Sequence, residues 1–203
     1  MPSFEYENSK YEKGYTAVCG CDEAGRGPLC GPVVAAAVIL PRDLEIEGLN
    51  DSKKISEKKR NELFDIIKEK AIAYGIAEAS PEEIDELNIL NASMLAMRRA
   101  VAKLSVKADF CLIDGNCSRG FDIDTETVVK GDAKSYSIAA ASILAKVTRD
   151  RLCEELGEQY PMYGIKKHKG YPTKDHMDAV RRFGAAPIYR KSFLKFLSKN
   201  EDT

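Results

Sequence analysis

Four acidic side chains stand at the ends of short apolar segments whose composition is typical of β-strands. The acidic residues are Asp22, Glu23, Asp114 and Asp132. The apolar segments are residues 16–21, 110–113 and 127–130. A carboxylate at the end of a buried strand has to be paired, hydrogen-bonded or bound to a metal, because its removal from water is unfavourable. If these strands are neighbours in one sheet, the carboxylates converge at one edge, and their hard oxygens suit Mg²⁺ or Mn²⁺.

Other chemistries fit the sequence less well. Cys19 and Cys21 have one residue between them, and His168 and His176 lack a cysteine pair at the spacing of a zinc site. The chain has no G-x-S-x-G motif and only two histidines, which argues against a serine nucleophile. Residues 25–28, Gly-Arg-Gly-Pro, do not match the phosphate loop G-x-x-x-x-G-K.

A glycine-rich segment, residues 24–27, follows the first acidic pair directly. Neighbouring residues of a strand point to opposite faces of the sheet, so Asp22 and Glu23 need a change of chain direction to reach one rim. Glycine allows such a turn, because it adopts backbone conformations that other residues avoid. On its own, the segment is interpreted more simply as an ordinary strand–turn–strand hairpin.

The hydrophobic pattern predicts an α/β fold, with a mixed sheet, flanking helices and a small helical C-terminal extension. Further strands are expected at residues 32–40 and 72–76. Helices are expected to begin at or after Ser56, Ser80, Ser135 and Thr173. Another helix has its apolar positions at Met94, Met97, Val101 and Leu104, and a last amphipathic stretch carries Phe193, Phe196 and Leu197. We divide the chain into a catalytic domain, residues 1–159, and a basic helical extension, residues 160–203.

Charge is distributed unevenly along the 203 residues. The formal net charge is −1, yet residues 160–199 carry ten Lys or Arg and only two Asp. This segregation favours a polyanionic partner such as nucleic acid. A basic solvated surface without a ligand would have the same pattern.

Composition bears on the location of the protein. Charged residues make up 31% of the chain, and the longest apolar run, residues 32–40, is too short to cross a bilayer. Residues 1–13 lack the cationic and apolar regions of a secretory signal. Three of the six cysteines lie in strand-like segments of a chain long enough to fold without disulfides, so we expect free thiols. The expected location is the cytoplasm, with no membrane partner.

Six motifs in order along the chain resemble those of bacterial ribonuclease HII, in the type 2 ribonuclease H family. They are DEAGRGP at 22–28, DSKK at 51–54, LIDGN at 112–116, KGD at 130–132, SILAKVTRD at 142–150 and HKGYPT at 168–173. Each motif alone is weak, but six in sequence are specific, and the resemblance covers residues 15–192. It implies a ribonuclease-H-like mixed sheet with a helical C-terminal extension. Ribonuclease HIII is disfavoured, because it carries an additional N-terminal domain and only a short segment precedes the first predicted strand.

The resemblance also implies roles for individual residues. The family's metal-binding and catalytic acids correspond to Asp22, Glu23, Asp114 and Asp132. A glycine–arginine–glycine element that is implied to recognise the ribose 2′-hydroxyl through backbone groups corresponds to Gly25, Arg26 and Gly27. Recognition through the backbone is physically reasonable, because glycine permits a close approach and the 2′-hydroxyl distinguishes RNA from DNA.

Four further residues complete the implied substrate site. Tyr171 would stack on the sugar at the RNA-to-DNA junction, and phosphate contacts would come from Lys53, Ser142 and Lys146. Without the resemblance, helix packing for Ser142 and a solvated loop for Lys53 are the simpler interpretations. Asp150 lies four residues after Lys146, so we interpret it as an intrahelical salt-bridge partner and not as a metal ligand.

The implied activity is that of a metal-dependent endoribonuclease with two Mg²⁺ or Mn²⁺ ions. It would cleave the RNA strand of RNA/DNA hybrids and the phosphodiester 5′ of a single ribonucleotide in duplex DNA, leaving a 3′-hydroxyl and a 5′-phosphate. Such activity would serve replication and ribonucleotide excision repair, and we expect a monomer. Two alternatives are a non-catalytic duplex-binding module and a resolvase- or transposase-type nuclease. The first has no use for clustered carboxylates, and the second lacks the glycine–arginine–glycine hairpin.

Overall fold

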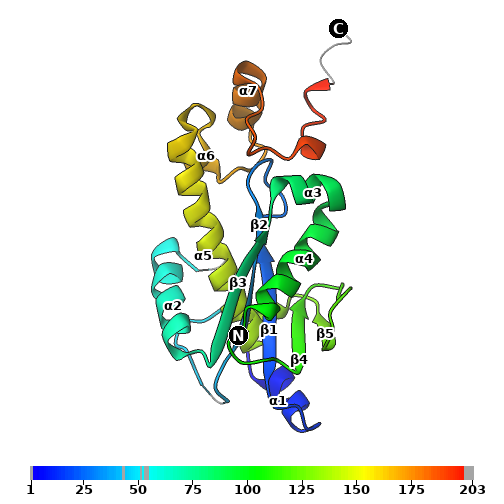
Figure 1. The fold of residues 1–203 in the computed structure, drawn as a ribbon. Helices are drawn as coiled ribbons and strands as arrows, with labels where there is room; N and C mark the ends of the chain where they lie inside the picture. The colour runs from blue at the N-terminus through cyan, green and yellow to red at the C-terminus, as the bar shows by residue number, and fades with distance from the viewer. Residues whose placement is uncertain (1, 43, 51, 53–54, 199–203) are drawn as a thin grey trace.

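A mixed β-sheet of five strands lies at the centre of the protein, in the order β3-β2-β1-β4-β5 (Figure 1). The computed structural model describes residues 2–42, 44–50, 52 and 55–198. The strands are β1 (Val18–Ala24), β2 (Val33–Ile39), β3 (Ala73–Ala79), β4 (Phe110–Asp114) and β5 (Asp124–Val128). Strand β1 pairs antiparallel with β2 and parallel with β4, and β5 extends the sheet in parallel. The central strand is therefore the one that ends in the first acidic pair.

Helices cover both faces of the sheet (Figure 1). The helices of the described chain are α1 (Glu5–Tyr11), α2 (Glu57–Lys70), α3 (Pro81–Leu87), α4 (Ile89–Ala102), α5 (Tyr136–Gln159), α6 (Ile165–His168) and α7 (Lys174–Phe183), of which α6 and α7 belong to the extension and lie beyond the end of the sheet. Side-chain oxygens cap α2, α3, α5 and α7 at the predicted residues Ser56, Ser80, Ser135 and Thr173. This mixed sheet between helical layers confirms the predicted fold class. No helix in the described part of the chain is long and apolar enough to cross a membrane.

The two largest hydrophobic cores among the described residues lie on opposite faces of the sheet. The core beneath α4 contains Met94 and Met97, as predicted, whereas α2 and α5 close the other core. Helix α5 packs tightly on β1 at Gly20, where an added Cβ would lie 2.2 Å from the carbonyl carbon of Ser137. Only a residue without a side chain fits there. This contact fixes how the end of β1 faces the middle of α5.

Two predicted elements differ from the structure. Strand β5 covers Asp124–Val128 instead of residues 127–130, because Lys130 adopts a left-handed conformation with φ of 57° that ends the extended chain. Asp132 consequently lies in a single-turn 3₁₀ helix, Gly131–Ala133, and not at a strand end. The last amphipathic stretch forms only the 3₁₀ turn Lys191–Phe193 followed by turns, since backbone groups of this segment bond to Asp85 on α3.

The extension beyond residue 159 packs against the loop that follows β1. The amide of Leu29 donates to Gly170 O at 2.8 Å, and the amide of Gly31 donates to Ile188 O at 2.8 Å. The amide of Arg190 returns a bond to Leu29 O at 2.9 Å. The boundary between residues 159 and 160 stays a prediction, because these contacts join the extension directly to the loop of the catalytic part.

Helix α1 does not follow from the sequence analysis, and it anchors the start of α5. Glu7 is 1% exposed, and its Oε1 accepts from the amide of Ser137 at 2.9 Å and from Ser135 Oγ at 2.6 Å. The carboxylate therefore lies at the N-terminus of α5, where the helix dipole favours negative charge. A short polar helix has little periodicity, so its tertiary role leaves no pattern in the sequence.

We expect Glu7→Ala to lower the free energy of unfolding by about 2–3 kcal/mol, because it leaves buried donors at the start of α5 without an acceptor. Glu5→Ala is the matched control, since Glu5 is exposed on the same helix. Urea unfolding of both variants measures the difference. Equal stabilities of the two variants would contradict the anchoring role of Glu7.

Candidate active site

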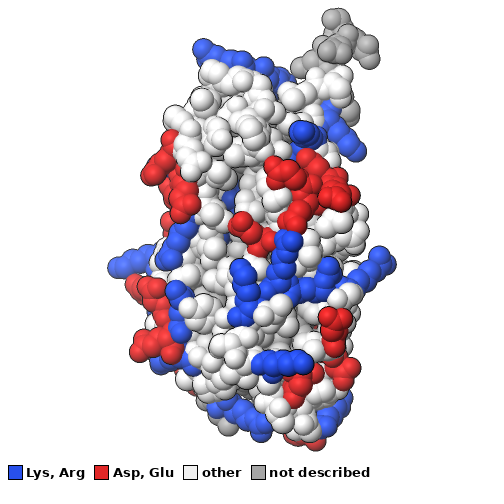
Figure 2. Space-filling view, in the orientation of Figure 1, with Lys and Arg blue, Asp and Glu red and all other residues white. Residues whose placement is uncertain are grey.

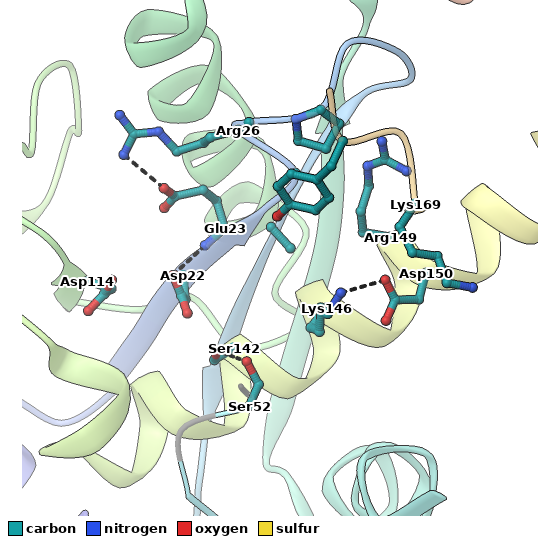
Figure 3. Close-up of a pocket in the computed structure, with 15 residues that line it drawn as sticks. Asp22, Glu23, Arg26, Ser52, Asp114, Ser142, Lys146, Arg149, Asp150 and Lys169 are labelled. Atoms are coloured by element: carbon teal, nitrogen blue, oxygen red, sulfur yellow. Dashed lines mark hydrogen bonds and ion pairs between the residues drawn. The ribbon is translucent and has the colours of Figure 1, made fainter. Parts of the chain in front are cut away.

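One pocket at the end of β1 brings together most of the predicted site residues (Figure 3). Those that line it are Asp22, Glu23, Gly25, Arg26, Gly27, Asp114, Ser142, Lys146 and Tyr171. The structure adds Ala24, Pro28, Ser52, Arg149, Asp150 and Lys169. Asp132 is not among the described lining residues, and Lys53 lies outside the part of the chain that the structure describes.

The register of the sheet explains why acidic residues from distant motifs meet. Strands β1 and β4 are parallel, and Cys21 pairs with Ile113. The next residue of each strand is an aspartate, so Asp22 and Asp114 emerge from the same end of the sheet. Asp114 Oδ1 accepts a hydrogen bond from the amide of Gly131 at 2.6 Å. This bond draws the turn that carries Asp132 toward the same end.

Asp22 and Glu23 point in different directions from the end of β1, as the alternation of a strand requires. The Asp22 side chain lies on the side of Ser142 in α5, whereas Glu23 Oε1 pairs with Arg26 Nη1 at 3.2 Å (Figure 3). The amide of Glu23 donates to Asp22 Oδ1 at 2.7 Å. Both carboxylates reach the pocket because the strand ends one residue later, at Ala24.

Burial and mutual repulsion dominate the electrostatics of the pocket. Burial raises the pKa of Asp22 well above its ordinary value, and the nearby charges of Glu23 and Asp114 raise it further. A hydrogen bond with Ser142 opposes this shift. Burial also raises the pKa of Glu23, against the opposing charge of Arg26. These acids are therefore held where negative charge is unfavourable unless a cation accompanies it.

The donor set of the pocket suits a hard divalent cation, because its acids offer only carboxylate oxygens. Cysteine and histidine, the ligands typical of zinc, are absent from the described lining. Among the described residues, no three His, Cys, Asp or Glu side chains form a ready-made cluster for one ion. The assignment of Asp22, Glu23, Asp114 and Asp132 as joint ligands stays a prediction.

Helix α5 contributes polar groups to one wall of the pocket. Ser142 Oγ lies 2.9 Å from Ser52 Oγ, and both side chains are buried. Lys146 Nζ pairs with Asp150 Oδ1 at 2.7 Å, which confirms the intrahelical salt bridge predicted for Asp150. The Arg60 guanidinium, on α2, donates to Ser52 O at 3.0 Å. Ser52 was not among the predicted site residues, although it belongs to the DSKK motif at 51–54.

The glycine–arginine–glycine turn and the candidate tyrosine are in contact. A Cβ on Gly27 would lie 3.2 Å from Cε1 of Tyr171, so the ring packs against the backbone of the turn. Gly25 has φ of +96°, a conformation that favours glycine. Tyr171 is 49% exposed, which leaves much of its ring open to solvent. The pocket thus combines acidic groups with an accessible backbone and an aromatic ring.

The basic extension reaches the pocket through Lys169, but local partners neutralise part of its charge. Ion pairs of the extension include Lys166 with Glu158 at 2.9 Å, Lys167 with Asp175 at 3.3 Å and Lys169 with Glu154. Figure 2 shows further Lys and Arg side chains at the end of the molecule formed by α7, with acidic side chains gathered below them over α3. The segregation seen in the sequence is therefore weaker on the folded surface than the residue count indicates.

Solved structures with the same fold identify the class of the protein. Ribonuclease H2 from Pyrococcus horikoshii superposes with a TM-score of 0.74 at 28% identity, covering 91% of this chain and 100% of that one. Ribonuclease HII from Archaeoglobus fulgidus, solved as a complex with PCNA, has a TM-score of 0.72 at 26% identity over 87% of this chain and 94% of that one. The fold is ribonuclease-H-like, and the acidic pocket lies at the end of its central strand.

The sequence comparisons place the chain within this class. The family model described as Ribonuclease HII matches residues 19–197. Ribonuclease HII of Clostridioides difficile is 56% identical over 190 residues, which cover 94% of this chain and 74% of that protein. The Dechloromonas aromatica protein of the same name is 61% identical over 176 residues, covering 87% and 90%. The chain belongs to the ribonuclease HII family and is a ribonuclease H, a hydrolase.

The raised pKa of Asp22 predicts how the metal-free protein responds to pH. The folded state binds the Asp22 proton more tightly than the unfolded state, so stability is lost as pH rises from the ordinary aspartate range, about 4, through the folded-state pKa. We expect the Asp22→Asn variant to lose less stability than the parent as pH rises. At pH 7 in EDTA, its free energy of unfolding should be higher than that of the parent. At pH 3 the two proteins should differ little.

Urea unfolding across this pH range measures the effect, with Asp65→Asn as control because Asp65 is exposed on α2. The control should follow the parent at every pH. A destabilised Asp22→Asn at pH 7 would mean that the Asp22 carboxylate is stabilised in the folded protein, contrary to its burial beside two other acids.

Proposed function

We propose that this ribonuclease H cleaves the RNA strand of RNA/DNA hybrids and also the phosphodiester on the 5′ side of a single ribonucleotide in duplex DNA. The products would carry a 3′-hydroxyl and a 5′-phosphate. The observation that carries the proposal is the contact between the Gly27 backbone and Tyr171 inside the pocket that also contains the acids. A group able to detect a ribose therefore lies beside groups able to support hydrolysis. Membership of the ribonuclease HII family supports this substrate class.

Recognition of the ribose would depend on the backbone and on one ring. The 2′-hydroxyl is the group that distinguishes RNA from DNA at a given position. Glycine at positions 25 and 27 leaves the main chain open to a sugar, because no Cβ stands in the way. The exposed ring of Tyr171 would stack on the neighbouring sugar. Neither contact reads a base edge, so cleavage would be largely independent of sequence.

The phosphates next to the cleaved bond would meet the wall formed by α5. Lys146 and Ser142 are four residues apart, so both side chains reach the pocket from one face of the helix. Lys169 adds positive charge from the extension. The proposed phosphate contact of Lys53 lies outside the described residues. Because Lys146 already pairs with Asp150, substrate phosphate would compete for an ammonium group that is held in place.

The acids would hold two divalent cations, Mg²⁺ or Mn²⁺. The ligands would be Asp22, Glu23, Asp114 and Asp132. When bound, such cations lower the pKa of an attacking water and stabilise the charge that develops on the leaving 3′ oxygen. Asp114 is held in position by the amide of Gly131, and Glu23 is held by Arg26. Asp22 stays buried against Ser142, which keeps its carboxylate at the base of the pocket.

We expect the parent protein to cleave a duplex with one ribonucleotide at a single bond in Mg²⁺ and not in EDTA. Asp22→Asn and Asp114→Asn should each lower cleavage about 100-fold or more, as when a group that stabilises transition-state charge is removed. Asp65→Asn should keep full activity. Gel analysis of end-labelled strands identifies the bond and both product ends. Near-normal Mg²⁺-dependent cleavage by either acidic-site variant would refute the proposed role of that carboxylate.

A second prediction concerns the aromatic contact. Tyr171→Ala should lower cleavage about 10- to 100-fold, because stacking is worth about 1–3 kcal/mol, and by a similar factor for all four ribonucleotides. Tyr171→Phe keeps the ring and should keep most of the activity. Four duplexes that differ only in the base of the ribonucleotide make the comparison. A loss confined to one base would show that the tyrosine contributes to base recognition instead.

A further inference from the structure

Arg190 lies in the extension, beside the Phe193 ring, but directs its side-chain hydrogen bonds to the loop that follows β1. It is the largest fully buried side chain in the described part of the protein. Its guanidinium donates to three backbone oxygens, with Nη2 to Gly25 O at 2.6 Å, Nη1 to Arg26 O at 2.9 Å and Nε to Gly31 O at 2.9 Å. One side chain therefore holds both ends of the glycine-rich loop, residues 25–31.

These bonds determine where the loop's amide groups point. In a trans peptide the carbonyl and the following N–H point in opposite directions, and the described chain has no cis peptide bond. Because the oxygens of Gly25 and Arg26 point toward Arg190, the amides of Arg26 and Gly27 point away from it. Within the described residues neither amide donates to another protein group. Both residues line the pocket, so these donors are available to a ligand.

The position of Arg190 is itself fixed by its neighbours. Its own amide donates to Leu29 O at 2.9 Å. The next two residues are held by Asp85 of α3, which accepts from the amides of Lys191 at 2.8 Å and Ser192 at 2.9 Å. The extension is thus tied to the catalytic part immediately beside the arginine, and the guanidinium has little freedom to move.

A purely structural role explains this arginine poorly. Among the described residues Arg190 forms no ion pair with a carboxylate, and Arg149, a second cation, lies nearby. Burial together with Arg149 lowers the pKa of Arg190 to about 9, which leaves it charged at neutral pH. An apolar side chain would fill the same volume without the desolvation of a charge. The guanidinium group supplies several N–H donors in a fixed planar arrangement, and these donors orient three carbonyl groups.

We propose that Arg190 is a positioning residue for ribose recognition. By holding the carbonyls of Gly25 and Arg26 from behind, it presents the amides of Arg26 and Gly27 to the 2′-oxygen of the substrate. This inference rests on the proposed function of the loop. It adds that discrimination between ribose and deoxyribose depends on a side chain from the extension that never touches the substrate.

The test compares binding of two duplexes that are identical except for one ribonucleotide. Fluorescence anisotropy with Mg²⁺ in an Asp114→Asn background gives both dissociation constants without turnover. Arg190→Lys keeps the positive charge but loses the planar set of N–H donors. We therefore expect the dissociation constant of the all-DNA duplex, divided by that of the ribonucleotide duplex, to fall about tenfold, while the affinity for the all-DNA duplex changes little. Partial unfolding lowers both apparent affinities by the same factor, so it cannot change the ratio.

A second pair of variants keeps the test decisive if Arg190→Lys does not fold. Asp85→Ala frees the segment that carries the arginine and should lower the ratio in the same direction. Asp178→Ala removes an exposed acid of the same extension and should leave the ratio unchanged. An unchanged ratio in a folded Arg190→Lys or in Asp85→Ala would overturn the inference. Failure of the proposed function would appear separately, as absence of cleavage of the ribonucleotide duplex by the parent.

Discussion

The close packing of α5 on β1 is the contact on which the rest of the structure depends. At Gly20 the helix approaches so near that a methyl group would collide with the backbone of Ser137. Because the two elements cannot slide without losing this fit, Asp22, two residues further along the strand, lies against Ser142. The helix is 24 residues long, so the same contact also directs its later turns toward the extension.

The pocket contains buried acids that repel one another and cations that partly offset this repulsion. The acids at the end of the sheet are buried beside one another, which raises the pKa of Asp22 and Glu23. Cations surround them but are already engaged, Arg26 with Glu23 and Lys146 with Asp150. Such a pocket favours an additional cation beside the acids, and its own cations favour a phosphate beside that cation. This balance supports the hydrolysis that we propose for the pocket.

The extension contributes side chains to the pocket as well as carrying the basic segment of the chain. Tyr171 and Lys169 line the pocket, and Arg190 reaches behind it to the carbonyls of the glycine-rich loop. The loop is therefore shaped from one side by the catalytic part and from the other by the extension. A division of the chain into a catalytic domain and a binding domain describes its order along the sequence, whereas the surface proposed to bind the ribose is formed by both parts.

Local patterns were enough to predict the strands other than β5, the capped helices and the acids at the ends of β1 and β4, because each depends on residues within a few positions of one another. The resemblance supplied the candidate roles. Tertiary structure alone decided that Asp132 sits in a 3₁₀ turn, that Glu7 closes the start of α5 and that Arg190 faces the loop at Gly25. The partners of Glu7 and Arg190 are more than 100 residues away. Such contacts form only when the packed sheet brings the segments together, so they leave no periodic signal in the sequence.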